Sequence, residues 1–570
     1  MLRLLLAIGL ACLAEAVELT PRFTSASTDD LLEWELRGAP PDWLSLDVQR
    51  TPLLTITDPA GRRWLRPAFM WQEGARNPDP RADPELVTVG ERALRIRHTA
   101  RLPGLHHWSL TDPAGNEIAH GDLSVAAGTA PTGPLAIHSR NSRLLAFADG
   151  TPFIPIGPNI AWAAGPDRLA LMERYFASLA QVGGTHARVW LASWCGQFEA
   201  ETPDAYRLER AWLVDGILAS ARAHGLHLTL VIDNHYDLVN GQGFPYGDDY
   251  LGRATRFLVR EPPPQYQRKL RYLLARWGAD DTVACWELFN EVDMACVQRE
   301  IAIPWITAAA ALLRRLDQDH RLSSVSWVGN DWDRVFDVAD LDLVQLRGYV
   351  LEWTQADEEV RVAGRDAVAL LAEQAARAVQ RARPFIFGEL GYQGLEAENH
   401  GNDLDADGLL LRQQAWAGFL LGGCGSGMNW WWDVYIDRRG LWEQYRGLAV
   451  AVRRLDWRDA SLTPLTPNPT GNLRVIGWVA PTQALLWPHI RSDTWYAALV
   501  EGRPRPVFPR PASATIGGFA ATTRFRATWL DQISGVEKNA EELLSDADGR
   551  LQLTVPADCR DLVVHLQRLP

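Results

Sequence analysis

The sequence predicts an α/β fold, a (β/α)8 TIM barrel flanked by an N-terminal β-sandwich and a C-terminal β-domain. In the middle of the chain, eight apolar runs alternate with amphipathic segments, a pattern typical of parallel strands joined by helices. The two ends of the chain instead carry short runs of alternating polarity separated by turns, as β-domains do. At 570 residues the chain is too long for one core, so several domains are expected.

Residues 1–16 are predicted to be a secretory signal peptide. Arg3 supplies a positive charge, the apolar run after it is too short to cross a bilayer, and Ala14 and Ala16 provide a cleavage site. The alternative is a buried N-terminal strand or helix. No later stretch reaches about 18 uninterrupted apolar residues. We therefore expect no membrane span, and a protein that is secreted or periplasmic.

Residues 17–127 are predicted to form the N-terminal β-sandwich. Two turns of the same sequence, Asp58-Pro59-Ala60-Gly61 and Asp112-Pro113-Ala114-Gly115, separate strand-like runs, and Asp, Pro and Gly each favour such turns. A segment rich in Gly and Pro, residues 128–134, is expected to end this domain.

Residues 134–458 are predicted to form the barrel. Apolar residues recur at helical spacing in the first amphipathic segment, at Leu169, Met172, Tyr175, Phe176 and Leu179. The strands between such segments are near-continuous apolar runs, which suits strands buried on both faces. The eight predicted strands are residues 153–156, 187–191, 226–232, 283–289, 323–328, 341–346, 384–387 and 428–432.

Residues 459–570 are predicted to form a second, sandwich-like β-domain. Residues 525–530 and 551–555 show the polarity of strands. Asp546-Ala547-Asp548-Gly549 is predicted to be a hairpin turn.

Composition excludes some classes of function. The chain has 57 basic and 70 acidic residues, a formal charge of -13 and no basic run, so nucleic acid is not an expected partner. The 25 tryptophans are numerous beside 12 tyrosines. Indole rings stack on the C–H faces of sugars, but they also fill cores and domain interfaces.

Neither the cysteines nor the acidic residues predict a metal site, and no cofactor is expected. Five cysteines follow the predicted signal, scattered and without a C-x-x-C motif, which disfavours structural zinc. One or two disulfides of open pairing are compatible with a secreted protein, and the odd number leaves one thiol over. Residues 403–408 match the start of a calcium loop, but position twelve is Gln414. Asp407-Gly408 before an apolar helix is more simply an N-cap.

Two glutamates end predicted barrel strands, Glu291 on the fourth and Glu389 on the seventh. In a (β/α)8 barrel the reactive residues lie at the carboxyl ends of strands, so the two side chains can face one another. A pair of carboxylates can divide the roles of acid and nucleophile in glycoside cleavage. Other polar and aromatic residues end the same strands: Arg188, His235, Asn290, Arg347, Tyr349, Trp430 and Trp432.

Several of these residues also have a purely structural interpretation. Arg188 could pair with Glu287 inside the barrel, and His235 could cap a loop. Strand alternation sends Trp430 and Trp432 to one side, so part of the tryptophan run could belong to the core. The structural interpretations do not explain why all these residues gather at strand ends.

Trp286-Glu287-Leu288-Phe289-Asn290-Glu291 resembles the strand-four motif of clan A glycoside hydrolases, the cellulase- and mannanase-like barrels related to family 5. Phe387-Gly388-Glu389 is similar to the strand-seven motif of that clan. The resemblance covers residues 143–457. It implies that Glu291 is the acid/base, Glu389 the nucleophile and Asn290 a contact to the sugar 2-hydroxyl.

The resemblance also implies a sugar-binding role for the residues that surround the two glutamates. Those in matching positions are Arg188, His235, Tyr349 and Trp430, and Trp432 is expected to join Trp430 as a stacking platform. One position departs from the clan, whose sixth strand usually carries His-x-Tyr where this chain has Arg347-Gly348-Tyr349. Arg347 is expected either to bind an acidic or otherwise unusual sugar or to pair with an acidic loop residue.

The sequence therefore predicts a retaining glycoside hydrolase that cleaves a β-linked oligo- or polysaccharide. A catalytically inactive carbohydrate-binding barrel is one alternative, and a hydrolase or transglycosylase for another glycoside, such as an arabinofuranoside, is a second. The loop at residues 241–247 is aromatic and turn-rich, so it is expected to shape one wall of the cleft. The sugar, the linkage, endo or exo action, the role of the flanking domains and the oligomeric state stay open.

Overall fold

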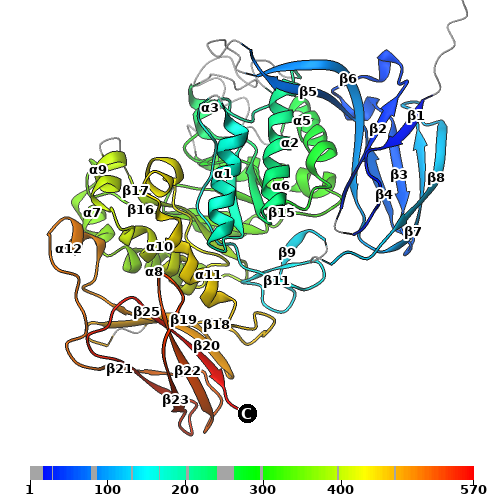
Figure 1. The fold of residues 1–570 in the computed structure, drawn as a ribbon. Helices are drawn as coiled ribbons and strands as arrows, with labels where there is room; N and C mark the ends of the chain where they lie inside the picture. The colour runs from blue at the N-terminus through cyan, green and yellow to red at the C-terminus, as the bar shows by residue number, and fades with distance from the viewer. Residues whose placement is uncertain are drawn as a thin grey trace, which may run out of the picture.

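The computed structural model describes most of the chain (Figure 1). The described residues are 17–28, 30–78, 86–129, 133–165, 167–199, 204–240, 262–295, 299–393, 397–467 and 470–570. The predicted signal at residues 1–16, Cys296 and the predicted cleft loop at residues 241–247 lie outside them.

The N-terminal part of the chain forms two four-stranded antiparallel sheets. One has the order β1 (Glu18–Pro21), β2 (Leu31–Arg37), β6 (Leu86–Thr99) and β5 (Phe69–Arg76), and the other β4 (Arg63–Pro67), β3 (Leu53–Thr57), β7 (Gly104–Thr111) and β8 (Glu117–Val125). Trp34, Leu54 and Ile96, from both sheets, are buried in one core. The two predicted Asp-Pro-Ala-Gly turns join β3 to β4 and β7 to β8, and in each the Asp carboxylate accepts a backbone N–H two residues on.

Six parallel strands in sequential order form the central sheet. They are β12 (His186–Trp190), β13 (His227–Val231), β14 (Val283–Glu287), β15 (Leu322–Ser326), β16 (Leu343–Val350) and β17 (Phe385–Tyr392). Each overlaps one of the predicted strands two to seven. The helices that alternate with them include α1 (Arg168–Gln181), α2 (Leu208–Ala223), α5 (Pro264–Trp277), α6 (Arg299–Leu316), α8 (Ala367–Ala378) and α10 (Leu409–Leu420). In α1 the buried residues are Met172, Tyr175, Phe176 and Leu179, all on the predicted apolar face.

The predicted first and eighth strands are irregular, although they close the ring. Asn159 bridges to Arg188 of β12, and Asn429 bridges to Leu390 of β17. The Asn159 backbone N–H donates to the Asn429 carbonyl at 2.9 Å, which joins the first segment to the last. Phe153 belongs instead to β11 (Pro152–Phe153), so the predicted first strand began too early. Two prolines, Pro155 and Pro158, lack the N–H that a regular ladder needs.

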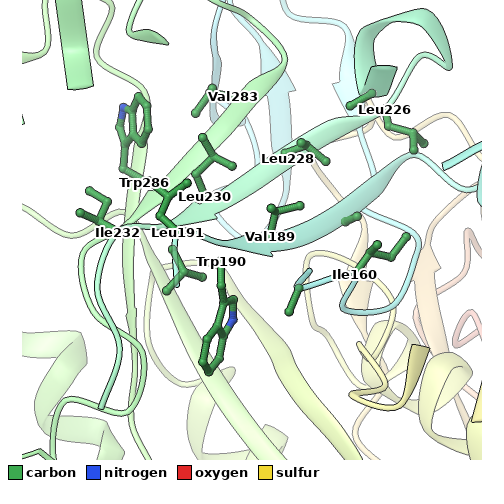
Figure 2. Close-up of a cluster of buried hydrophobic side chains, with 14 of the residues drawn as sticks. Ile160, Val189, Trp190, Leu191, Leu226, Leu228, Leu230, Ile232, Val283 and Trp286 are labelled. Carbon is green, nitrogen blue, oxygen red and sulfur yellow. The ribbon is translucent and has the colours of Figure 1, made fainter. Parts of the chain in front are cut away.

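Strand alternation separates the two faces of the barrel wall (Figure 2). Leu228 and Leu230 of β13 and Trp286 of β14 are buried in the main apolar core. In Figure 2 the Trp190 ring of β12 points away from Leu228 and Leu230. Trp190 shares its face with Arg188, whose guanidinium lies 5.3 Å from the indole centroid. The polar barrel interior and the apolar layer under the helices therefore follow from single-residue alternation.

A small sheet of β9 (Leu135–Ile137), β10 (Leu145–Phe147) and β11 closes the amino-terminal end of the barrel. Leu135, Leu145 and Phe153 pack there against Cys285, Cys424 and Met428 in a separate apolar cluster. The cavity left behind this cluster is only about 20 Å³. The opposite end, where the strands finish, carries the polar residues.

The C-terminal part forms a six-stranded antiparallel sheet with a two-stranded sheet beside it. The order in the large sheet is β18 (Thr463–Pro464), β19 (Leu473–Ala480), β20 (Gln483–Ile490), β25 (Leu562–Arg568), β22 (Arg524–Asp531) and β23 (Glu537–Leu544), and the small one pairs β21 (Ala512–Ile516) with β24 (Leu551–Val555). The predicted hairpin at residues 546–549 is wrong. The turn forms, but it leads from β23 in the large sheet to β24 in the small one.

The flanking sheets pack on different helices of the barrel (Figure 1). On the N-terminal side β5 and β6 contact α2 and α5. The buried carboxylate of Asp319 there accepts from Arg66 at 2.7 Å and from Arg101 at 2.6 Å. On the C-terminal side the Trp478 indole donates to the Phe419 carbonyl at 3.0 Å.

Asp319→Asn is expected to destabilise the protein at neutral pH by about 3 kcal/mol, because two buried arginines lose their anion. Burial raises the pKa of Asp319, but Arg66, Arg101 and Arg321 outweigh it and hold this pKa below its ordinary value. A lowered folded-state pKa stabilises the fold above the unfolded value of about 3.9, and this contribution fades as pH falls below it. The urea midpoints of wild type and variant should therefore differ at neutral pH and converge as the pH falls below about 4. A gap that stays constant with pH would contradict this assignment, and exposed Asp333→Asn is the matched control.

The described cysteines, Cys195, Cys285, Cys424 and Cys559, are all free thiols, so the expected disulfides do not form among them. In the acidic loop at residues 403–408, a carboxylate accepts hydrogen bonds from backbone N–H groups. The Asp405 carboxylate accepts from the N–H groups of Leu409 and Leu410 at 2.7 and 2.9 Å. Gly408 is the N-cap residue of α10, so the predicted cap at Asp407-Gly408 is correctly placed, but the carboxylate that accepts the first N–H groups is that of Asp405. Among the described residues no helix has the length and apolar character needed to cross a membrane.

Candidate active site

Glu291 lies in the turn that follows β14, and Glu389 lies within β17, which continues to Tyr392. Arg347 pairs with both side chains, which places them at the same end of the barrel. A register shift between β16 and β17 leaves Gly388 unmatched, so that Arg347 stands opposite Glu389. Position 388 also has no room for a side chain, because a Cβ there would lie 2.2 Å from the Gln345 side-chain oxygen. Arg347 and Tyr349 are two residues apart on β16 and so face the same side. The shift thus brings both toward Glu389.

Glu389 is buried and fully engaged. Its Oε1 accepts from Arg188 at 2.8 Å and forms an ion pair with Arg347 Nη2 at 2.8 Å, and its Oε2 accepts from the Tyr349 hydroxyl at 2.8 Å. Burial raises the pKa of Glu389, but Arg347, Arg188 and the Tyr349 hydrogen bond outweigh it and set this pKa below its ordinary value. Burial and the nearby Glu389 charge raise the pKa of Tyr349 well above its usual range, which keeps the hydroxyl protonated. The site therefore holds Glu389 as a carboxylate.

Glu291 is placed by a strained turn. Its φ of 53° lies in the left-handed region, which costs a non-glycine residue of order 1–3 kcal/mol. Its backbone N–H donates to Ser326 Oγ at 2.8 Å, and Oε2 lies 2.9 Å from His235 Nδ1. Burial first, and then Arg347, lower the pKa of His235 to about 4. His235 is therefore neutral at neutral pH and contacts Glu291 as an uncharged ring.

Arg188 is 1 % exposed and connects the surrounding polar groups. It makes two 2.6 Å bonds to the Glu287 carboxylate, which is the structural pairing considered above, and it also binds Glu389. Its remaining bonds go to the side-chain oxygens of Asn159 at 3.1 Å and Asn290 at 2.6 Å. Arg188 is thus enclosed by protein and orients other side chains.

Among the described residues, the acidic partners of Arg347 are the two candidate catalytic glutamates. Its Nη1 pairs with Glu291 Oε1, its Nη2 pairs with Glu389 Oε1, and Nη2 donates to Asn290 Oδ1 at 3.3 Å. Asn290 is held further by Ser326 Oγ, which donates to the same oxygen at 2.9 Å. The amide oxygen of Asn290 therefore faces donors, and its amide nitrogen faces His235 Nδ1 at 3.1 Å.

Tryptophans form one side of the site. Trp430 is half-buried and lies 5.6 Å from Trp162 and 5.1 Å from Trp190 between ring centroids. Trp194 and Tyr236 are 36 % and 52 % exposed and stand edge to face. Trp432 is only 2 % exposed and donates to the Trp162 carbonyl. The expected stacking role of Trp432 is therefore wrong, because its side chain is almost wholly buried beside Trp162 and Trp430.

Three positioning residues were not singled out from the sequence. Ser326, at the end of β15, holds both Glu291 and Asn290. Gln345 donates to Glu287 at 2.6 Å from β16, and Asn159 joins Arg188 to the last barrel segment. Asn159 was visible at a strand end. Gln345 and Ser326 are polar residues at buried strand positions, which was the available signal.

Curated proteins match part of this chain. Mannan endo-1,4-beta-mannosidase 7 of Arabidopsis thaliana is 28 % identical over 202 residues, covering 31 % of this chain and 46 % of that protein. Mannan endo-1,4-beta-mannosidase 3 of Oryza sativa subsp. japonica is 25 % identical over 215 residues, covering 32 % and 45 %. The chain thus spans less than half the length of these curated relatives. No protein-family model matches it.

Solved structures match more of the chain. A glycoside hydrolase family 5 protein from Bacteroides vulgatus ATCC 8482 has a TM-score of 0.53 at 14 % identity and covers 76 % of this chain and 94 % of its own. Another protein of that bacterium has a TM-score of 0.58 at 12 % identity and covers 96 % and 100 %. At such identities the likeness concerns the fold. The resemblance to clan A barrels of family 5 is confirmed at that level.

Proposed function

We propose that this protein is a retaining glycoside hydrolase that cleaves a β-linked polysaccharide by double displacement, with Glu389 as nucleophile and Glu291 as acid/base. The observation that carries the proposal is the unequal environment of the two carboxylates. Two arginines and a tyrosine hydroxyl keep Glu389 ionised, as a nucleophile must be. Glu291 is bound by one arginine and a neutral histidine, so it is the carboxylate that can more readily accept a proton.

In this mechanism Glu389 attacks the anomeric carbon while Glu291 protonates the leaving oxygen. The carbon–oxygen bond of the glycoside breaks as the bond to the Glu389 carboxylate forms. Glu291, now ionised, then removes a proton from water, which attacks the same carbon and releases Glu389. Asn290 binds the sugar 2-hydroxyl, where a contact that tightens in the transition state lowers the barrier. Trp430 supplies a stacking face.

The proposed substrate class is a neutral β-linked glycan, and β-1,4-mannan is the first to test. The curated relatives named above are mannan endo-1,4-beta-mannosidases. We further propose that residues 1–16 direct secretion, that residues 134–458 carry the activity, and that residues 17–127 and 459–570 brace the barrel. Buried ion pairs between Asp319 and the N-terminal arginines support the bracing role.

Proton NMR of early products should test the stereochemistry. With β-mannan as substrate, the first sugar released is expected in the β configuration, and its α anomer should appear only through mutarotation. In a crystal structure the two carboxyl groups should lie about 5–5.5 Å apart, whereas about 6.5–9.5 Å would indicate inversion.

Other products would replace the proposal by a named alternative. Initial α product would indicate inversion, and transfer to added acceptor sugars a transglycosylase. Glycan binding without any product across a broad panel would indicate a binding protein.

A further inference from the structure

Arg347 holds both candidate catalytic carboxylates at once. One guanidinium nitrogen pairs with Glu291 and the other pairs with Glu389. The three side chains are 11 %, 12 % and 5 % exposed, in the order Arg347, Glu291 and Glu389. The cation is therefore largely shielded from water. In such a low-dielectric place its attraction to nearby carboxylates is strong.

The charges around Arg347 leave one anion in excess. Two arginines face three glutamates, and one neutral histidine and one neutral tyrosine lie among them. These groups are Arg188 on β12, His235 after β13, Glu287 on β14, Glu291 after β14, Arg347 and Tyr349 on β16, and Glu389 on β17. Asp293, which follows Glu291, is bound by the backbone N–H groups of Val328 and Gly329 at 2.9 Å each.

One added proton would balance this set. Arg188 is matched by Glu287 through two bonds, which leaves Arg347 to share Glu291 and Glu389. If Glu291 takes the proton, Arg347 is matched by Glu389 alone. The acid role requires that protonated form of Glu291, whereas contact with Arg347 favours the ionised form. The same contact favours the nucleophile role of Glu389. Arg347 thus favours the nucleophile role of Glu389 and disfavours the acid role of Glu291.

We propose that Arg347 is a positioning residue that keeps both glutamates ionised in the free site, and that a bound sugar separates it from Glu291 so that Glu291 gains its proton. This inference rests on the proposed function. The same charges indicate an uncharged sugar, because an acidic sugar would add a second unmatched anion. The expected binding of an acidic sugar by Arg347 is therefore set aside.

The first test is the pH profile of kcat/KM on β-mannan for wild type, Arg347→Gln and Arg347→Lys. Removal of the cation should move the alkaline limb, which reports Glu291 in the free enzyme, to higher pH by about 1–3 units. Lysine keeps the charge, so its alkaline limb should stay near that of wild type. The acid limb should move less, because Arg188 still binds Glu389. An unmoved limb in Arg347→Gln, or an equal shift in Arg347→Lys, would overturn the proposal.

The second test does not depend on turnover. Infrared spectra of the substrate-free protein report the C=O stretch of a protonated carboxyl group, and Glu291→Gln identifies the contribution of Glu291. This band should persist to higher pH in Arg347→Gln than in wild type. If Glu389→Gln kept full turnover, the proposed function would fail, while the band would still decide the role of Arg347. A band that titrates identically in both proteins would exclude that role.

The third test concerns substrate charge. Wild type should bind a β-linked uronate oligosaccharide more weakly than a neutral oligosaccharide of the same length, as measured by calorimetry. Tighter binding of the uronate that disappears in Arg347→Gln would show that Arg347 recognises an acidic sugar after all.

Discussion

Glu389→Gln is expected to lower kcat on β-mannan by about 10⁴-fold or more, because an amide cannot form the glycosyl–enzyme bond. The melting temperature should change by only a few degrees. In this variant the amide oxygen can still accept from Arg188, and the amide nitrogen can donate to the Tyr349 oxygen. The substitution also leaves two arginines facing two glutamates, so the charges of the site balance. A large loss of activity with little loss of stability is typical of a residue kept for chemistry.

Glu35→Gln is a matched control for Glu389→Gln, since Glu35 lies on β2 of the N-terminal sheet and pairs with Arg22. Its turnover should equal that of wild type. Added azide or formate should restore part of the turnover of Glu389→Ala, because a small anion can replace the missing nucleophile. Turnover of Glu389→Gln close to wild type on a confirmed substrate would remove Glu389 from the mechanism.

Arg188→Met is expected to have the largest effect on stability, with a loss of about 3–5 kcal/mol in the free energy of unfolding. The substitution leaves the fully buried Glu287 carboxylate without its arginine, and among the described side chains Gln345 is then its remaining donor. An isolated buried charge is much more costly than a buried pair. Urea unfolding followed by tryptophan fluorescence measures the loss, and turnover should fall as well because Glu389 loses one of its donors.

A double variant separates the charge from the packing. Arg188→Met with Glu287→Met removes both charges, so much of the lost stability should return, whereas turnover should stay low. Arg174→Met removes an arginine of similar type from an exposed pair with Asp437, and it should cost at most about 1 kcal/mol. If Arg188→Met lowered the free energy of unfolding no more than Arg174→Met does, the buried ion pairs of Arg188 would not contribute to stability.

The sequence was sufficient to predict the barrel strands and the residues at their ends. Near-continuous apolar runs identified strands two to seven, because a strand covered on both faces has a distinct composition. The clustering of Glu291, Glu389, Arg188 and Tyr349 followed from the rule that parallel strands finish at one edge of the barrel. Such inferences depend on local pattern alone, and this is why they could be made.

Other features depend on contacts between distant segments. Trp430 and Trp432 have the same strand alternation, yet Trp430 is half-buried whereas Trp432 is only 2 % exposed. The partners of Arg347 depend on the register between β16 and β17, which the apolar pattern does not specify. The first and last barrel segments were misjudged in part because prolines and glycines interrupt their ladders. The apolar pattern of the sequence identifies the strands, whereas the register between strands and the burial of individual side chains can be known only from the folded structure.

The way the ring of strands closes has a consequence for catalysis. Where the chain's first barrel segment meets its last, few ladder bonds hold the wall together. There the Asn159 amide nitrogen acts as a clasp, reaching the carbonyls of Gly388 at 3.0 Å and of Met428 and Asn429 at 3.3 Å each. The oxygen of the same amide receives Arg188, and Gly388 directly precedes Glu389. A change at Asn159 is therefore expected to disturb both the closure of the barrel and the placement of Glu389, the proposed nucleophile.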